Sequence, residues 1–117
     1  MATGRRAARR TALFLLYQWD VTGQPLASLH EGEVDDYARF LAESVAARAA
    51  ELDALITEAA EGWTADRLGA VERNVLRIAV QELEAGDVPE PVAIDEAVGL
   101  AKRYASDEAG RLSLIHI

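Results

Sequence analysis

The chain has 117 residues, half of them hydrophobic and 27% charged, which is typical of one globular domain and excludes a disordered segment. It contains no cysteine, which excludes disulfide bonds, a thiolate nucleophile and a zinc site built on sulfur, and which fits a reducing compartment such as the cytoplasm. The formal net charge of −8 is unevenly distributed: residues 1–19 hold four of the twelve basic groups and no acidic group, so the remainder holds eight basic and all twenty acidic groups.

The N-terminal segment has the spacing of an amphipathic helix over residues 5–20. Its apolar side chains recur every three or four residues and form one stripe, made of Ala8, Ala12, Leu13, Leu15, Leu16, Tyr17 and Trp19. Arg6, Arg9 and Arg10 are spaced so that they share a face, which Arg5 joins through Arg9. Because the positive end of the helix dipole disfavours cations in the first turns, helix stability alone does not account for these arginines.

This arginine face (Arg5, Arg6, Arg9 and Arg10) predicts a binding site for a polyanion. A basic patch on an acidic protein attracts a polyanion at the patch and repels it elsewhere, which gives orientation as well as attraction. Arginine offers two parallel hydrogen bonds to phosphate and stacks on bases. Four charges predict modest affinity with a marked salt dependence. A solvated helix start is one alternative, and an arginine-rich targeting peptide is another.

Three further helices are expected along the chain. The sequence VTGQP at residues 21–25 ends the first helix, and one more turn is expected around residues 26–29. Longer helical patterns follow at residues 34–61, 66–85 and 92–105, the last of them after Pro89 and Pro91. The short connections favour an all-α bundle in which neighbouring helices pack together. The apolar run at residues 13–17 is far shorter than the roughly 20 residues of a membrane-spanning helix, so no membrane association is expected.

Residues that could support catalysis or metal binding do not form a recognisable set. His30 lies in a polar segment and is interpreted as a surface side chain. The acidic run from Glu31 to Asp36 could bind a cation, but we expect it to cap the following helix, where acids complement the dipole. The sequence contains no Ser/His/Asp set at a spacing recognisable as a catalytic triad, and it contains no glycine-rich loop of the kind that binds phosphate. We therefore expect no catalysis, no cofactor and no bound metal.

Charged residues of the helix expected at 66–85 form two groups. Glu82 borders the apolar stripe, so it is expected to pair with an arginine, with contact to a partner protein as the alternative. Glu72, Arg73 and Arg77 are placed on the other face of this helix. That face is expected to be solvated with weak ion pairs, and contact with a partner is again the alternative.

Three segments together resemble the NusB family of transcription antitermination factors. RRAARRTALFLLYQWD (residues 5–20) is similar to the first helix of the family, and VERNVLRIAVQEL (residues 71–83) is similar to its central helix. VPEPVAIDEAVGLAKRYASDEAGR (residues 88–111) is similar to the helix that follows a proline-containing turn. The resemblance covers nearly all of residues 5–111, in the same order and spacing.

The resemblance implies an all-helical bundle of two small packed subdomains, with residues 1–111 as a single RNA-binding domain. It implies binding of boxA-type RNA in nascent ribosomal RNA together with the ribosomal protein NusE, in a complex that helps RNA polymerase resist termination; homodimers also occur in such proteins. By the match, the arginine face lies in the RNA-contacting helix and Tyr17 beside it. Glu72 matches an acidic position at the surface that faces NusE. The loop that approaches RNA is matched by Asp107, Glu108 and Arg111.

The chain departs from the family pattern toward its end. Asp95 stands where asparagine is usual and Gly99 where glutamate is usual. After the Arg111 position the family continues into a further helix, whereas here the sequence is LSLIHI, residues 112–117. One DNA string that would encode these six residues, CTG TCT CTT ATA CAC ATC, is a transposase end sequence used in preparing sequencing libraries. We therefore interpret residues 112–117 as a non-native tail and expect the last helix to be missing and the fold to be marginal; the coding DNA tests this interpretation.

Two other functions stay open from the sequence. NusB-like domains also occur at the N-terminus of some ribosomal RNA cytosine-5 methyltransferases, and the complete reading frame would identify such an enzyme. A helical protein–protein interaction module with a solvated arginine face is the other alternative, which titration with boxA-type RNA would distinguish.

Overall fold

The computed structural model describes residues 2–28, 34–59, 69–86, 89, 91–92 and 94, and the side chains of all of these except residues 2–6 and 59. Within these ranges the chain is helical and contains no strand, which confirms the all-α prediction. The elements in chain order are α1 (Ala2–Thr22), the short 3-10 helix η1 (Leu26–Ser28), α2 (Asp36–Ala47), α3 (Ala49–Ala59) and α4 (Ala70–Glu84).

Helix α1 ends where the sequence VTGQP predicts. Gly23 adopts a φ of +75°, a left-handed conformation that glycine accepts without steric cost. Its backbone N–H donates to the carbonyl of Trp19 at 2.9 Å, so the last turn is closed by the C-terminal motif that such a glycine permits. The chain then forms η1, close to the single turn expected there.

Helix α2 begins at an aspartate that caps it. The Asp35 carboxylate accepts hydrogen bonds from the backbone N–H groups of Tyr37 (3.0 Å) and Ala38 (3.1 Å). These bonds satisfy donors that have no partner inside the helix. Asp36 adds a negative charge in the first turn, where the helix dipole favours it. The expected capping role of the acidic run is therefore confirmed at its end, while residues 29–33, including His30, lie outside the described residues.

The prediction of a single helix over residues 34–61 is wrong, because the helix is interrupted at Arg48, which separates α2 from α3. Arg48 has φ −110° and ψ 13°, and its N–H donates to the carbonyls of Ser44 and Val45. Its guanidinium bonds Glu51 in the first turn of α3 and reaches Gln81 and Glu84 on α4. The break therefore lets one side chain tie the α2–α3 junction to α4.

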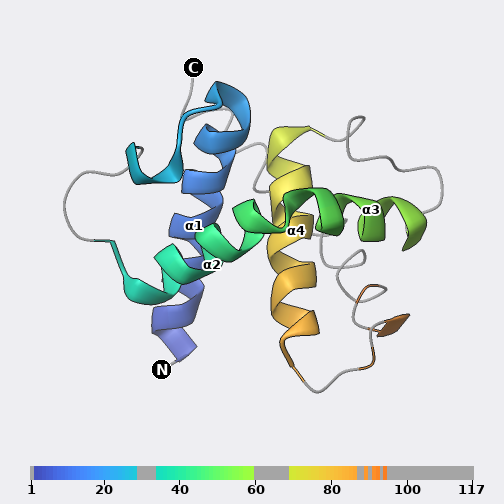
Figure 1. Ribbon diagram of the computed structural model, residues 1–117. Helices are drawn as coiled ribbons and strands as arrows, with labels where there is room; N and C mark the ends of the chain where they lie inside the picture. Colours follow the sequence, from blue (N-terminus) through green and yellow to red (C-terminus); the bar gives the residue numbers. More distant parts are fainter. Residues whose placement is uncertain are drawn as a thin grey trace.

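Helix α4 lies at the centre of the described fold. Figure 1 shows α1 and α4 side by side and running in opposite directions, with α2 crossing α1 toward α4 and α3 lying across α4 and extending away from it. Gly69 precedes α4 without a side-chain cap, and Glu72 supplies an acid in its first turn. Helix α4 contacts each of α1, α2 and α3, so it fixes the position of the three other helices.

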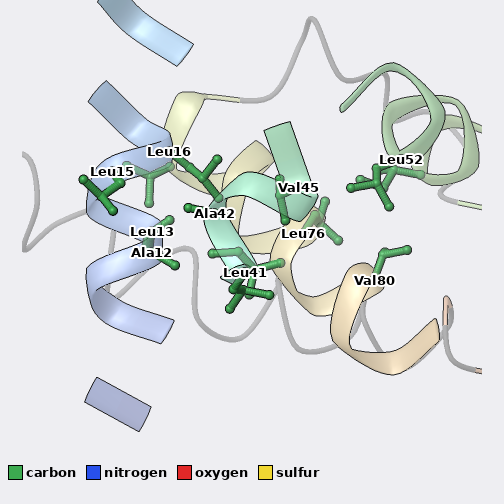
Figure 2. Packing of buried hydrophobic residues seen from close by; sticks show 13 residues of the cluster. Ala12, Leu13, Leu15, Leu16, Leu41, Ala42, Val45, Leu52, Leu76 and Val80 are labelled. Atoms are coloured by element: carbon green, nitrogen blue, oxygen red, sulfur yellow. The ribbon is translucent and has the colours of Figure 1, made fainter. Parts of the chain in front are cut away.

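The hydrophobic core lies between these four helices. Figure 2 shows Leu41 and Val45 of α2 between the α1 leucines and the α4 side chains Leu76 and Val80. The predicted α1 stripe is confirmed, because its alanines and leucines are buried and its two aromatic residues pack against the core. Burial of apolar area of this kind contributes about 25 cal/mol per Å². The arginine side of α1 is therefore held in place by the opposite side of the same helix.

The C-terminal predictions fall largely outside the described residues. Pro91, Val92 and Ile94 are helical, in agreement with a helix that starts near residue 92, and Ile94 is buried. The whole segment from residue 95 onward, which includes Asp95 and Gly99, lies outside the described part. The division into two subdomains and the domain limits stay predictions. None of the described helices is long and apolar enough to cross a membrane.

Candidate nucleic-acid interface

The first three turns of α1 carry the arginine face. The backbone of all four arginines is helical, so the spacing on which the prediction rests is confirmed. Arg9 and Arg10 are exposed, whereas Ala8 and Ala12 beside them are buried against the core. The side chains of Arg5 and Arg6 lie outside the described set. Burial of the small alanines turns the long cationic side chains of Arg9 and Arg10 toward solvent.

Arg9 is held by a carboxylate from the central helix. Its Nε donates to Oε1 of Glu82 at 2.7 Å and to Oε2 at 2.9 Å. The phenol of Tyr37 on α2 donates to the same Oε2 at 2.6 Å. The Glu82 side chain is 17% exposed and the Arg9 side chain 46% exposed, so the carboxylate lies on the inner side of the guanidinium. The expected pairing of Glu82 with an arginine is confirmed, and the partner is a residue of the arginine face.

Tyr17 and Trp19 contribute to the core more than to the arginine face. Both are half-buried and pack against the hydrophobic cluster. The Trp19 ring also lies 5.9 Å from the guanidinium carbon of Arg77, a cation–π distance. The role of Tyr17 beside RNA stays a prediction. The loop residues expected near RNA, Asp107, Glu108 and Arg111, lie outside the described residues.

Arg73 and Arg77 do not lie on a solvated face, so that expectation is wrong. Arg77 is buried, with Nε and Nη2 donating to Asp53 of α3 at 2.7 and 2.6 Å and Nη1 donating to Asp20 of α1 at 3.2 Å. Arg73 Nε donates to the same Asp20 oxygen at 2.8 Å. The buried side chain of Asn74 bridges Asp20 and Arg77, because its amide nitrogen donates to Asp20 and its amide oxygen accepts from Arg77. This ion-pair cluster joins α1, α3 and α4.

The charge state of Arg77 follows from its surroundings. Burial by itself lowers the pKa of this guanidinium, but the hydrogen bonds and charges of Asp53 and Asp20 outweigh burial and raise the pKa. The side chain is therefore a fixed cation inside the fold. A partner protein could reach it only by displacing the two aspartates, so Arg77 supports the fold rather than an exposed contact.

Of the four residues considered for contact with a partner protein, Glu72 is the one that is not engaged by another described side chain. The other three are Arg73, Arg77 and Glu82. Glu72 is half-buried in the first turn of α4, and it makes no hydrogen bond to any other residue in the described ranges. Its carboxylate is the acidic group in the first turn of α4. The site thus offers one acidic position near the start of α4 and a cationic face on α1.

Other ligand sites are poorly supported in the described part of the chain. No three acidic or histidine side chains gather there closely enough to hold a metal ion. An open hollow lies between α1, η1 and α2, away from the arginine face, and its lining consists of Leu15, Leu26, Ala27, Arg39, Ala42 and Glu43. It contains one acid and one base at its rim and offers no converging set of polar groups.

Comparison with known proteins places this arrangement among antitermination factors. The model of the NusB family matches residues 6–113. A transcription antitermination protein NusB from Rubrobacter xylanophilus is 44% identical over 112 residues, which is 90% of this chain and 81% of the relative. The NusB of Salinispora tropica is 42% identical and covers 92% of this chain and 87% of its own.

Solved structures of such proteins have a similar fold. A crystal structure of the antitermination factors NusB and NusE in complex with dsRNA superposes with a TM-score of 0.66 at 32% identity, over 96% of this chain and 91% of the other. The solution structure of NusB from Aquifex aeolicus gives a TM-score of 0.60 at 34% identity, over 92% and 80% of the two chains.

Proposed function

Since this chain belongs to the NusB family, we propose that it is a transcription antitermination factor that binds boxA-type RNA together with NusE. In this proposal the chain acts within the antitermination complex of RNA polymerase and works by binding, without catalysing a reaction. The names of its relatives support an antitermination role over that of a methyltransferase appendage. The observation that carries the proposal is the likeness to a NusB crystallised with NusE and dsRNA, over nearly the whole chain.

The arginine face is the proposed RNA contact. Arg9 and Arg10 are exposed on α1, and the backbone puts Arg5 and Arg6 in the preceding turns of the same helix. Guanidinium groups in this arrangement can each take a phosphate oxygen. The remainder of the chain is acidic, so RNA is attracted to this face and repelled elsewhere. Tyr17, Asp107, Glu108 and Arg111 remain in the proposal on the family resemblance alone.

Glu72 is the proposed contact with NusE. It is an acidic side chain at the start of the central helix with no hydrogen bond to another described residue, which leaves it able to accept one from a basic partner. Arg73 and Arg77 serve this contact indirectly, because their bonds to Asp20 and Asp53 fix α4. Glu82 pairs with Arg9 and is assigned to the RNA side instead.

Fluorescence anisotropy with a labelled boxA-type RNA tests the proposal. We expect the chain alone to bind weakly, and the chain with NusE to bind between about 5-fold and 150-fold more tightly, the usual range of coupling between two ligands. Glu72→Ala is expected to weaken NusE binding while leaving RNA binding by the chain alone unchanged. Glu58→Ala is the matched control, because Glu58 is an exposed carboxylate on α3, a helix that carries neither proposed contact. Absence of RNA binding both with and without NusE would contradict the proposal.

A further inference from the structure

Four arginines pair with carboxylates in the described fold, namely Arg9, Arg48, Arg73 and Arg77. Three of them, Arg9, Arg48 and Arg77, show how differently the guanidinium nitrogens are used. Arg77 donates from all three guanidinium nitrogens to Asp20, Asp53 and Asn74. Arg48 also donates from all three, to glutamates and to Gln81. Arg9 donates from Nε alone, and its two Nη groups make no hydrogen bond to any other residue of the described part. Two of these arginines are thus fully occupied, whereas Arg9 keeps its outer edge open.

The open edge of Arg9 faces away from its carboxylate. Since Nε points to Glu82, and Glu82 is the more buried partner, the Nη1–Nη2 edge lies on the more exposed side of the planar guanidinium. That edge carries four N–H donors in the fork geometry that matches two oxygens of a phosphate. Arg9 is therefore held from inside and presents a phosphate-binding edge outside.

The carboxylate is itself fixed. Tyr37 donates its phenol hydrogen to Glu82 Oε2, and Tyr37 is half-buried in the first turn of α2. Glu82 lies on α4, which packs against both α1 and α2. The order of contacts from the core outward is Tyr37, Glu82, Arg9. A flexible arginine loses less conformational freedom on binding when a rigid partner has already oriented it.

We propose that Glu82 is a positioning residue for RNA binding, which orients Arg9 toward a backbone phosphate and is itself oriented by Tyr37. This inference rests on the proposed function, because the ligand class it names is the phosphate of a bound RNA. Glu82 touches no RNA and acts through Arg9. The negative charge of Glu82 also repels phosphate, which opposes the benefit of orienting Arg9. Replacement by glutamine separates the two effects, because glutamine keeps an oxygen acceptor and lacks the charge.

The test is a double-mutant cycle measured with a labelled boxA-type RNA in the presence of NusE. Arg9→Ala and Glu82→Ala are each expected to weaken binding about 3- to 5-fold, as for one exposed charged contact. The double variant Arg9→Ala/Glu82→Ala is expected to bind no more weakly than Arg9→Ala alone. Glu82→Gln keeps an oxygen acceptor for Nε and removes the charge, so it is expected to bind at least as tightly as the unchanged chain.

Two controls separate positioning from stability. Glu84→Ala removes another α4 carboxylate paired with an arginine, Arg48, and is expected to leave RNA affinity unchanged. Tyr37→Phe removes the phenol hydroxyl that donates to Glu82. It is expected to weaken binding in the unchanged chain and to have no effect in the Arg9→Ala background. Thermal unfolding of every variant shows which of them remain folded, and Glu82→Gln and Tyr37→Phe complete the test if Glu82→Ala unfolds.

The inference and the proposed function fail in different ways. If Glu82→Ala weakens binding equally with and without Arg9, or tightens binding, Glu82 does not position Arg9 and the inference is overturned while RNA binding stands. If Arg9→Ala has no effect on RNA affinity, the inference fails and the RNA contact assigned to Arg9 fails with it. If no RNA binds with NusE present, the proposed function itself is wrong.

Discussion

The guanidinium of Arg77 is enclosed by side chains from three helices. Its side chain is 6% exposed, and its aspartate partners Asp20 and Asp53 are 17% and 25% exposed. Taking such charges out of water costs several kcal/mol, which their mutual attraction offsets only when the hydrogen bonds are complete. Here all three nitrogens of Arg77 are satisfied. Removing the cation would leave the Asp20 and Asp53 carboxylates without their shared partner, which destabilises the folded chain.

Arg77→Met therefore tests the buried cluster. We expect the free energy of unfolding to fall by about 3 kcal/mol, the cost typical of breaking one partner out of a buried ion pair. Arg39→Met is the matched control, because Arg39 is exposed on α2, and it is expected to change stability by less than about 0.5 kcal/mol. Urea unfolding followed by circular dichroism measures both. A loss below about 1 kcal/mol for Arg77→Met would show that the cluster contributes little.

The buried state of Arg77 could not be predicted from local spacing. On the helix Arg77 follows Arg73 by four residues, a pattern that usually belongs to a solvated face. What buries it are carboxylates distant in sequence, on α1 and α3, which a helical period does not register. By contrast, the pairing of Glu82 with some arginine could be predicted from its place at the edge of the stripe, while the identity of Arg9 required the packing of α1 on α4.

At the scale of the elements, the junction between α2 and α3 depends on one side chain. Val45 and Leu52 are both fully buried and seven residues apart, so the apolar period continues unchanged through the break. For this reason the sequence predicts one helix where the structure has two. The signal for the break is a polar residue, Arg48, whose hydrogen bonds to Glu51 and Glu84 bridge α3 and α4. The end of α1, the start of α2 and the end of α4 were predictable because glycine and aspartate mark them locally. The start expected at residue 66 is wrong, because α4 begins at Ala70, directly after Gly69.

Carboxyl titration tests this junction. The hydrogen bond and charge of Arg48 lower the pKa of Glu51 below its ordinary value of 4.5, and hydrogen bonds to Glu51 and Glu84 raise the pKa of Arg48. Because the pKa of Glu51 is lowered in the folded chain, its stabilising contribution is complete above pH 4.5 and is lost as the pH falls through the lowered pKa. NMR titration of the Glu51 side-chain carboxyl is expected to give a higher pKa in Arg48→Ala than in the unchanged chain. An equal pKa in both would contradict the bridge.

At the scale of the whole molecule, polar contacts of α4 brace the helix that carries the arginine face. Glu82 reaches Arg9 near the start of α1, and Arg73 and Arg77 reach Asp20 near its end. Between these points the α1 leucines pack in the core. Helix α1 is therefore held at both ends and along its inner side, which keeps its outer side available in one orientation. The uneven charge distribution, positive on α1 and negative elsewhere, then directs a polyanion to that side.

The most direct measurement is the salt dependence of RNA binding by the chain with NusE, compared with a variant in which Arg5, Arg6, Arg9 and Arg10 are all alanine. Alanine is a strong helix former, and removal of cations relieves the positive end of the α1 dipole, so helix α1 is expected to form in the variant. If each arginine contacts one phosphate of single-stranded RNA, the slope of log K against log salt concentration is shallower by about 3 in the variant. We expect this loss of slope together with an affinity reduced at least about 30-fold, or roughly 2 kcal/mol. An unchanged slope and affinity would contradict the account, because RNA would then bind somewhere other than the arginine face.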